Sequence, residues 1–458
     1  MSEPITAGHG DKSGLGAALV CITTLFFIWA FVTNLIDPLV KSMKVIYTLS
    51  DFETQLNQFA FFIGYGVMSI PAAWFLARKG YVNSILLGLV GVVAGCLIAW
   101  ATTFSHSFVT VLIGLFVAAS GIALLQVAAN PLIASMGAPK GAHFRLNLSQ
   151  AFNSMGAYLG GLFGAAYLLK GELFAKDVVL TEAMRTEGLS FVTHAYLLIA
   201  AAVALFIIGV ILVRRSIARH APAMAERQAS PFAALGSKWA RLGTLGIFVY
   251  VGAEVCVISG MIFFLEQKQI LDVPAQVAGF IAPLFMLLAM FGRFAGSVVL
   301  RYVKATTMLA LVAAGAALLC ATVIATFEMP PTPLGGTVTL PGGHVAPLTL
   351  GFVPAAATIL IGLFNSIMFP TIFTVTLERA SSPASATSGL MCMAISGGGI
   401  VSLVYGGVID LLVANFPVGA RSLAYVVPLA CYAYVLWFAL AARKAPTHQI
   451  EEGVTAAH

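Results

Sequence analysis

Residues 15–40 read LGAALVCITTLFFIWAFVTNLIDPLV, an apolar run that contains a single charged residue, Asp37. A helix that crosses the hydrocarbon core of a bilayer needs about 20 predominantly apolar residues. The run is long enough for this, and it follows a polar stretch that does not resemble a cleavable signal peptide. We therefore expect residues 15–40 to be the first span of a membrane protein.

The rest of the chain repeats this pattern. Of its 458 residues, 60% are hydrophobic and only 9% are charged, whereas a soluble domain carries about 25% charged residues. Lipid must therefore cover most of the surface, and each span must be a helix because unpaired backbone groups are costly in lipid. The sequence predicts an all-α membrane protein with twelve transmembrane helices, at residues 15–40, 54–77, 82–103, 108–136, 147–169, 190–213, 242–265, 275–300, 305–327, 347–376, 386–412 and 420–442.

The distribution of Lys and Arg predicts the orientation, because positive residues concentrate in cytoplasmic loops. If the N-terminus is cytoplasmic, 16 of the 24 Lys and Arg residues fall on the cytoplasmic side, 7 fall outside, and Arg293 lies within a span. We therefore expect both termini in the cytoplasm. The net charge of +6 then reflects topology, and no nucleic acid partner is expected.

Two polar stretches divide the chain. Residues 214–241 are the longest basic stretch and are expected to form a cytoplasmic linker. They separate an N-terminal six-helix bundle, residues 15–213, from a C-terminal six-helix bundle, residues 242–442. Residues 328–346 are rich in Pro and Gly and contain an alternating GTVTL segment, which indicates an outer loop that can hold a small hairpin.

Two pairs of matching segments indicate an internal repeat. The segment QVAANP at 126–131 and the segment NSIMFP at 365–370 both place an amide side chain five residues before a proline. A Ser-x-Gly pattern at 154–156 in the fifth span recurs at 396–398 in the eleventh. The offsets, 239 and 242 residues, nearly agree. This predicts two structurally related halves with pseudo-twofold symmetry.

Three charged residues stand out within the predicted spans, because a charge inside the membrane costs about 2.5–3.5 kcal/mol even on translocon-based scales. Asp37 precedes Pro38; it either ends the first helix at the interface, with Lys41 one turn further on to screen it, or it lines a polar cavity. Glu254 lies near the centre of the seventh span, with no Lys or Arg within a helical turn. We interpret it as a protonatable coupling carboxyl, or else as a protonated helix–helix contact. Arg293 is interpreted as an interfacial or gate-lining cation.

Seven amide side chains occupy otherwise apolar helices. Several lie three or four residues apart in the first, fourth and fifth spans, so they share a helix face. An amide both donates and accepts hydrogen bonds, which suits a polyhydroxylated ligand, although any one amide could simply join two helices. Together with Asp37 they are predicted to line one substrate cavity: Asn34, Asp37, Gln58, Gln126, Asn130, Gln150, Asn153 and Asn365.

The sequence predicts no enzyme activity, metal site or cofactor. All six cysteines lie inside apolar segments without Cys-x-x-Cys spacing, which is typical of small buried apolar residues. There is no His-Glu-x-x-His motif, and the glycine clusters are not followed by the Lys-Ser/Thr of a phosphate loop.

Six segments carry a family resemblance: LFFIWAFVTNLIDPL (25–39), LLQVAANP (124–131), RLNLSQAFNSMGAYLGGLFG (145–164), YVGAEV (250–255), GLFNSIMFPTIF (362–373) and MAISGGGIV (393–401). They resemble the major facilitator superfamily, and within it the fucose–proton symporter family, especially its glucose/galactose transporter branch. The resemblance implies a 6+6 fold with alternating access. It also implies that Asp37 matches the sugar-recognising acid of the first helix, Asn34 the amide before it, and Gln150 and Asn153 the polar pair of the fifth helix.

The chain departs from the fucose pattern in two places. Fucose symporters carry a coupling glutamate where this chain has Gln126, and an amide where it has Glu254. The resemblance therefore implies that the coupling acid has moved to the seventh helix, as Glu254, with Asp37 as a second candidate. The acidic residue usual before the basic pair Arg78 and Lys79 is replaced by Ala77, which puts the gate pairing of that loop in doubt.

These observations predict a secondary active transporter. It would import a hexose such as glucose or galactose, or an N-acetylhexosamine, by symport with H⁺, or alternatively with Na⁺. A drug/H⁺ antiporter and a non-transporting sugar sensor are the other hypotheses. We expect a multi-pass protein of the bacterial inner membrane that works as a monomer, with the sugar and the lipid bilayer as its partners.

Overall fold

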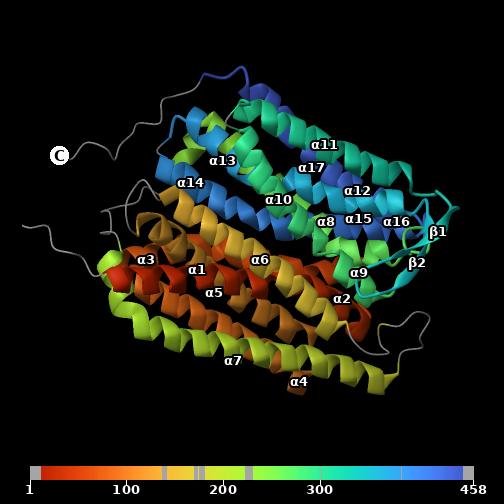
Figure 1. Cartoon of the computed structure of the whole chain (residues 1–458), viewed down its shortest axis with the longest axis horizontal. Helices are drawn as coiled ribbons and strands as arrows, with labels where there is room; N and C mark the ends of the chain where they lie inside the picture. Colours follow the sequence, from red (N-terminus) through yellow and green to blue (C-terminus); the bar gives the residue numbers. More distant parts are fainter. Residues whose placement is uncertain are drawn as a thin grey trace, which may run out of the picture.

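The computed structural model describes residues 12–136, 142–169, 174, 181–221, 231–300, 302–382 and 384–446. The side chains of some residues within these ranges, including Asp37, lie outside the described part. The described residues form a bundle of long helices with a two-stranded hairpin at one end, and α1 begins and α17 ends at the opposite end of the bundle (Figure 1). Eleven segments among them are long and apolar enough to cross a membrane, and the twelfth expected position, residues 147–169, is occupied by α6.

The helices pack in two groups (Figure 1). Within the first group α6 lies against α1, and within the second α15 lies against α8. The first group consists of α1 (Lys12–Asn34), α2 (Ile36–Tyr47), α3 (Asp51–Trp100), α4 (Thr102–Ser105), α5 (Phe108–Ser135), α6 (Ala142–Leu168) and α7 (Glu182–His220).

The second group follows a short 3₁₀ helix, η3 (Pro231–Gly236). Its helices are α8 (Lys238–Leu265), α9 (Ala275–Ile281), α10 (Leu284–Val299), α11 (Ala305–Ala325), α12 (Phe352–Asn365), α13 (Met368–Arg379), α14 (Ala384–Met393), η4 (Ala394–Ser396), α15 (Gly397–Val413), α16 (Ala420–Leu423) and α17 (Val426–Ala442).

Several expected spans are interrupted. The first span breaks at Leu35 and then continues as α2 to Tyr47, so the alternative in which Asp37 ends the first helix is wrong. Pro38 stands at the third position of α2, where its missing N–H costs nothing because the first N–H groups of a helix have no partner within the helix. Spans eight, ten, eleven and twelve are also split. The second and third spans instead join at Gly80, whose φ of 76° with ψ of 174° only glycine adopts readily.

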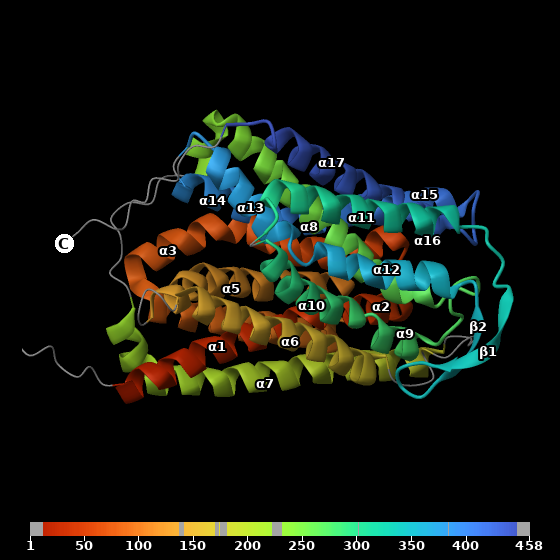
Figure 2. The same cartoon turned by 45° about the horizontal axis from the view of Figure 1, so that its top comes forward.

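The expected outer hairpin is present. Strands β1 (Pro333–Thr339) and β2 (Val345–Thr349) pair antiparallel, with Val338 opposite Ala346. The strand continues to Thr349, so the tenth span starts at Phe352 and not at 347 as predicted. The loop between the strands reaches back to the bundle beside α9, as the turned view shows (Figure 2).

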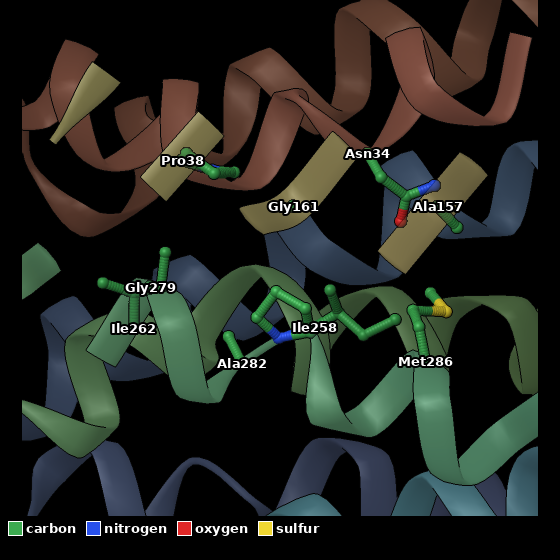
Figure 3. A pocket seen from close by; sticks show the side chains of 10 residues that line it. Asn34, Pro38, Ala157, Gly161, Ile258, Ile262, Gly279, Ala282 and Met286 are labelled. Atoms are coloured by element: carbon green, nitrogen blue, oxygen red, sulfur yellow. The ribbon is translucent and has the colours of Figure 1, made fainter. Parts of the chain in front are cut away.

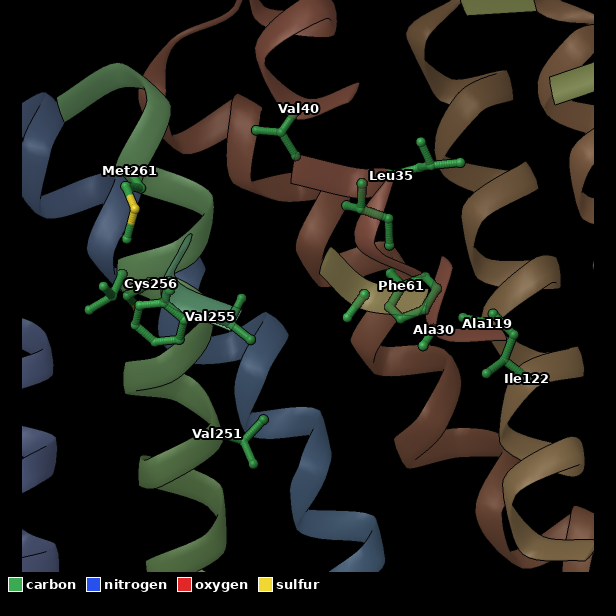
Figure 4. Close-up of a cluster of buried hydrophobic side chains, with 14 of the residues drawn as sticks. Ala30, Leu35, Val40, Phe61, Ala119, Ile122, Val251, Val255, Cys256 and Met261 are labelled. Carbon is green, nitrogen blue, oxygen red and sulfur yellow. The ribbon is translucent and has the colours of Figure 1, made fainter. Parts of the chain in front are cut away.

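The core of each group is apolar, and the two cores face each other across the middle of the molecule. Figure 4 shows Val251 and Val255 of α8 on one side, and Leu35 and Phe61 of the first group on the other. These four side chains are at most 7% exposed. Burial of this kind fixes the facing surfaces of the two groups, and α8 of the second group carries Tyr250 and Glu254, which are considered below.

Small residues let α3 and α5 approach closely, and Gly95 is the tightest point. A Cβ atom on Gly95 would lie 2.4 Å from the backbone nitrogen of Ala118 and 2.5 Å from the carbonyl oxygen of Gly114. We expect Gly95→Ala to destabilise the protein by about 1–3 kcal/mol, because backbone on both sides would have to shift. Thermal unfolding of the purified protein measures this.

Gly209→Ala is the matched control for this prediction. Gly209 also lies inside a long helix, α7, but a Cβ there would meet no atom within 4 Å. Its unfolding temperature should stay the same or rise slightly, since Ala is the better helix former. Equal unfolding temperatures for the two variants would contradict the packing argument.

Candidate functional site

An ionic network joins the two helix groups near the C-terminal end of α2, the end expected to face outward. Lys41 of α2 lies 2.5 Å from Glu266, which follows α8. Asp51, the first residue of α3, accepts from Lys44 at 2.5 Å and from Arg421 of α16 at 2.7 and 3.0 Å. Lys41 thus joins the two groups directly, by its ion pair with Glu266. Lys44 joins them indirectly, because Asp51 binds both Lys44 and Arg421.

Two further contacts reinforce this closure. The carboxylate of Asp410 on α15 accepts hydrogen bonds from the backbone N–H groups of Asp51 and Phe52 at 2.9 and 2.8 Å. The second helix group thus supplies an anion at the N-terminus of α3, a helix of the first group. The ring of Phe263 lies 4.9 to 5.4 Å from the cationic ends of Lys41, Lys44 and Arg421, within the range of cation–π attraction.

Below this network a narrow cavity separates the groups (Figure 3). It encloses about 20 Å³, enough for a water molecule but much too small for a hexose. Asn34 lies on one side of it, with Ile258 of α8 and Met286 of α10 on the other. The Nδ2 atom of Asn34 donates to the carbonyl of Ala30 at 2.9 Å, and its Oδ1 is left to face the cavity. The groups are therefore nearly in contact at this level.

The predicted amides of the fourth and fifth spans hold different partners. Gln126 of α5 donates to the hydroxyl of Tyr65 on α3 at 3.0 Å. Asn153 of α6 donates to the backbone carbonyl of Phe26 on α1 at 3.2 Å. The Oδ1 atom of Asn130 is buried without a hydrogen-bond partner. Asn153 is thus brought to α1, while Gln126 is held against α3.

The other predicted residues of the first group are less informative. Gln58 on α3 is 3% exposed, and Gln150 on α6 is half-buried. The side chain of Asp37 lies outside the described residues. That these side chains line one cavity stays a prediction.

Glu254 has a counter-charge that its own helix does not supply. Its side chain interacts electrostatically with Arg293 of α10 and lies near the hydroxyl of Tyr250, one helical turn away on α8. Arg293 also donates to Ser154 of α6 at 2.8 Å. No Lys or Arg of its own helix lies within a turn of Glu254, as the sequence shows, but Arg293 acts on it from another helix. Arg293, interpreted as an interfacial or gate-lining cation, reaches into the contact between the two groups.

The tenth span is broken beside this charge pair. Residues 366 and 367 separate α12 from α13, and Asn365 is the last residue of α12. The Asn365 side chain is 1% exposed, yet neither its Oδ1 nor its Nδ2 has a hydrogen-bond partner. The hydroxyl of Tyr432 lies next to it, also buried and without a well-aligned bond. A buried amide without a well-aligned hydrogen bond costs about 1–3 kcal/mol, so this position calls for an explanation such as a bound water or a ligand.

A model of the Major Facilitator Superfamily matches residues 22–403. This chain belongs to the major facilitator superfamily. Among curated relatives of this facilitator, the glucose/galactose transporter of Brucella abortus (strain 9-941) is 34% identical over 97% of this chain and 98% of the relative. The L-fucose-proton symporter of Escherichia coli (strain K12) is 31% identical over 94% of each chain.

A solved structure is similar along the same length. The crystal structure of the superfamily transporter FucP in the outward conformation is 27% identical to this facilitator, with a TM-score of 0.64, over 93% of this chain and 98% of that one. The expected fold and family are confirmed, and the facilitator is a multi-pass membrane protein. Its cytoplasmic termini and its division at residues 214–241 stay predictions.

Two tyrosines of the site were not predicted from the sequence, and the partner of a third residue, Arg293, was not predicted. Tyr65 and Tyr250 were not considered, because a Tyr in an apolar span is more often part of the core. Arg293 was interpreted as an interfacial or gate-lining cation, without a partner. The available signal was its depth in a predicted span, since a charge there calls for a partner of opposite sign.

Proposed function

We propose that the chain imports a sugar across the bacterial inner membrane by proton symport, with alternating access between the two helix groups. The observation that carries this proposal is Glu254, a carboxyl deep in the seventh span whose partner, Arg293, is bonded to the opposite group. The names of the relatives, a glucose/galactose transporter and an L-fucose-proton symporter, support the substrate class and the proton.

The residues divide into two roles in this mechanism. The amides offer paired donors and acceptors to sugar hydroxyls, with Asn34, Gln126 and Asn153 on one group and Asn365 on the other. Glu254 takes up a proton from outside, which weakens its attraction to Arg293, and releases it inside. Because the sugar would contact both groups, its binding and the protonation of Glu254 would bias the same rearrangement.

A proton suits this position better than Na⁺. A sodium site needs several oxygen ligands and no competing cation, and the guanidinium of Arg293 already interacts with Glu254. A pH gradient should therefore drive uptake in proteoliposomes when no Na⁺ is present. Uptake that requires Na⁺ would favour the alternative coupling.

The substrate class is tested by thermal stabilisation of the purified protein. A panel of glucose, galactose, fucose and N-acetylglucosamine is compared with lipophilic cations, and radiolabelled uptake of each stabilising compound follows. Stabilisation and uptake of one sugar would support the proposal. Stabilisation by lipophilic cations alone would contradict it and favour a drug antiporter.

Asn365→Leu separates a ligand role from a structural one. Because both amide atoms are unpartnered, the variant should be as stable as the wild type, or more so, without sugar. Its affinity for sugar should fall about tenfold, since a hydrogen bond to the ligand is lost. Binding is measured from the sugar-dependent shift in unfolding temperature.

Asn57→Leu is the matched control for this variant. Asn57 is also a fully buried amide; its Nδ2 donates to the backbone carbonyl of Thr54 at 2.9 Å within α3, its Oδ1 has no hydrogen-bond partner, and it is not among the predicted site residues. This variant should keep its sugar affinity. A normal sugar response in Asn365→Leu would remove Asn365 from the site.

A further inference from the structure

The break in the tenth span is held by a hydrogen bond from another helix. The hydroxyl of Tyr250 on α8 donates to the backbone carbonyl of Asn365 at 3.1 Å, and Tyr250 is 2% exposed. A carbonyl at the end of a helix has no partner within that helix. Tyr250 therefore supplies a bond that the interruption between α12 and α13 would otherwise leave unmade.

The helix that carries Arg293 packs against the same break. A Cβ on Gly292 would lie 2.5 Å from Ser366 Oγ and 2.7 Å from the carbonyl oxygen of Leu363, and one on Gly296 would lie 2.4 Å from Ile367. Thus α10 touches the break on either side of Arg293, with no room between. A shift of α8 or α10 must therefore displace residues 363–367.

Glu254 interacts with residues of both helices that contact the break, α8 and α10. The titratable and charged groups that act on it are Tyr250 of its own helix, Arg293 of α10 and Tyr432 of α17. A phenol has one proton and donates to one acceptor at a time. The carboxyl of Glu254 also lies within hydrogen-bonding reach of the Tyr250 hydroxyl. Because an ionised carboxylate is a stronger acceptor than a backbone carbonyl, donation to Asn365 is the arrangement expected for a neutral Glu254.

We propose that Tyr250 is a positioning residue that transmits the protonation state of Glu254 to the break in the tenth span. When Glu254 is neutral, Tyr250 holds the carbonyl of Asn365 and the break is clamped. When Glu254 loses its proton, the hydroxyl turns to the carboxylate and the break is released. The inference rests on the proposed proton symport and names the element that the proton moves.

Tyr250→Phe removes only the hydroxyl, and Tyr434→Phe is its matched control. Tyr434 makes the same kind of bond, from its hydroxyl to the backbone carbonyl of Leu242 at 3.0 Å, away from the charge pair. In proteoliposomes, Tyr250→Phe should keep sugar counterflow, lose about fivefold in accumulation driven by a pH gradient, and show counterflow that no longer varies with pH. Tyr434→Phe should behave as the wild type in all three assays.

Amide hydrogen exchange of peptides covering residues 363–369 tests the proposal without relying on transport. At a pH where the wild type carries an ionised Glu254, these amides should exchange about fivefold faster than in Glu254→Gln at the same pH. In the Tyr250→Phe background that difference should vanish. Equal exchange in the wild type and Glu254→Gln at every pH would overturn the proposal.

Failure of the proposed proton symport and failure of the proposed role of Tyr250 give different results. If proton symport is wrong, the wild type itself shows no accumulation driven by a pH gradient. If only the role of Tyr250 is wrong, the wild type accumulates sugar, Glu254→Gln does not, and Tyr250→Phe keeps both the accumulation and the pH profile of Tyr434→Phe.

Discussion

Glu254→Gln is expected to abolish the accumulation of sugar driven by a pH gradient, while sugar counterflow continues. Glutamine keeps the shape and hydrogen bonding of a protonated glutamate but cannot release a proton. The transporter would then alternate as if it were always protonated. Counterflow needs no net proton movement, so exchange of labelled for unlabelled sugar should survive, and its rate should no longer depend on pH.

The accumulation ratio in proteoliposomes measures this effect. It should fall to one, the largest functional loss expected for any single substitution here. Glu378→Gln is the control, because Glu378 on α13 is 40% exposed and pairs only with its neighbour Arg379 among the described residues. Accumulation at the wild-type level in Glu254→Gln would refute the coupling role of Glu254 and leave Asp37 as the remaining candidate.

Asp51→Asn is expected to open the outer end of the transporter. The carboxylate of Asp51 holds both Lys44 and Arg421, and its side chain is 11% exposed. Replacing it leaves two largely buried cations facing each other without their shared anion. Loss of such charge-assisted bonds costs about 1–3 kcal/mol. The share due to Arg421 falls on the outward-closed state alone, because that bond exists only while the two groups touch, whereas the bond to Lys44 lies within one group.

Labelling of a cysteine introduced at Ile258 reports this opening. Ile258 lines the narrow cavity beneath the network, so an impermeant maleimide added outside reaches it only in the outward-open state. Labelling should rise about tenfold in Asp51→Asn. Glu53→Gln is the control at the same helix end. The carboxylate of Glu53 accepts a hydrogen bond from the backbone N–H of Ser50 at 2.8 Å, and a Gln side chain can accept the same bond. Equal labelling in the two variants would rule out Asp51 as part of the gate.

Much of the fold could be predicted because it depends on composition over long windows. Lipid solvates apolar helices whatever their neighbours are, so twelve positions follow from hydropathy, and the structure has helices at all of them. The hairpin at 333–349 follows from its turn residues and alternation. The interruptions at Leu35 and at 366–367 could not be predicted, since a window of about 20 residues averages over a single turn.

The candidate site shows the same division. The sequence by itself determined which polar residues enter the membrane, because each is an exception in an apolar run, and Glu254, Arg293 and Asn365 stand out in that way. Only the tertiary structure decided their partners: Arg293 beside Glu254, Tyr250 on the carbonyl of Asn365, and Arg421 on Asp51. The physical reason is that a charge or a hydrogen bond acts over a few ångströms of space, and helix packing, not sequence distance, sets which residues come that close.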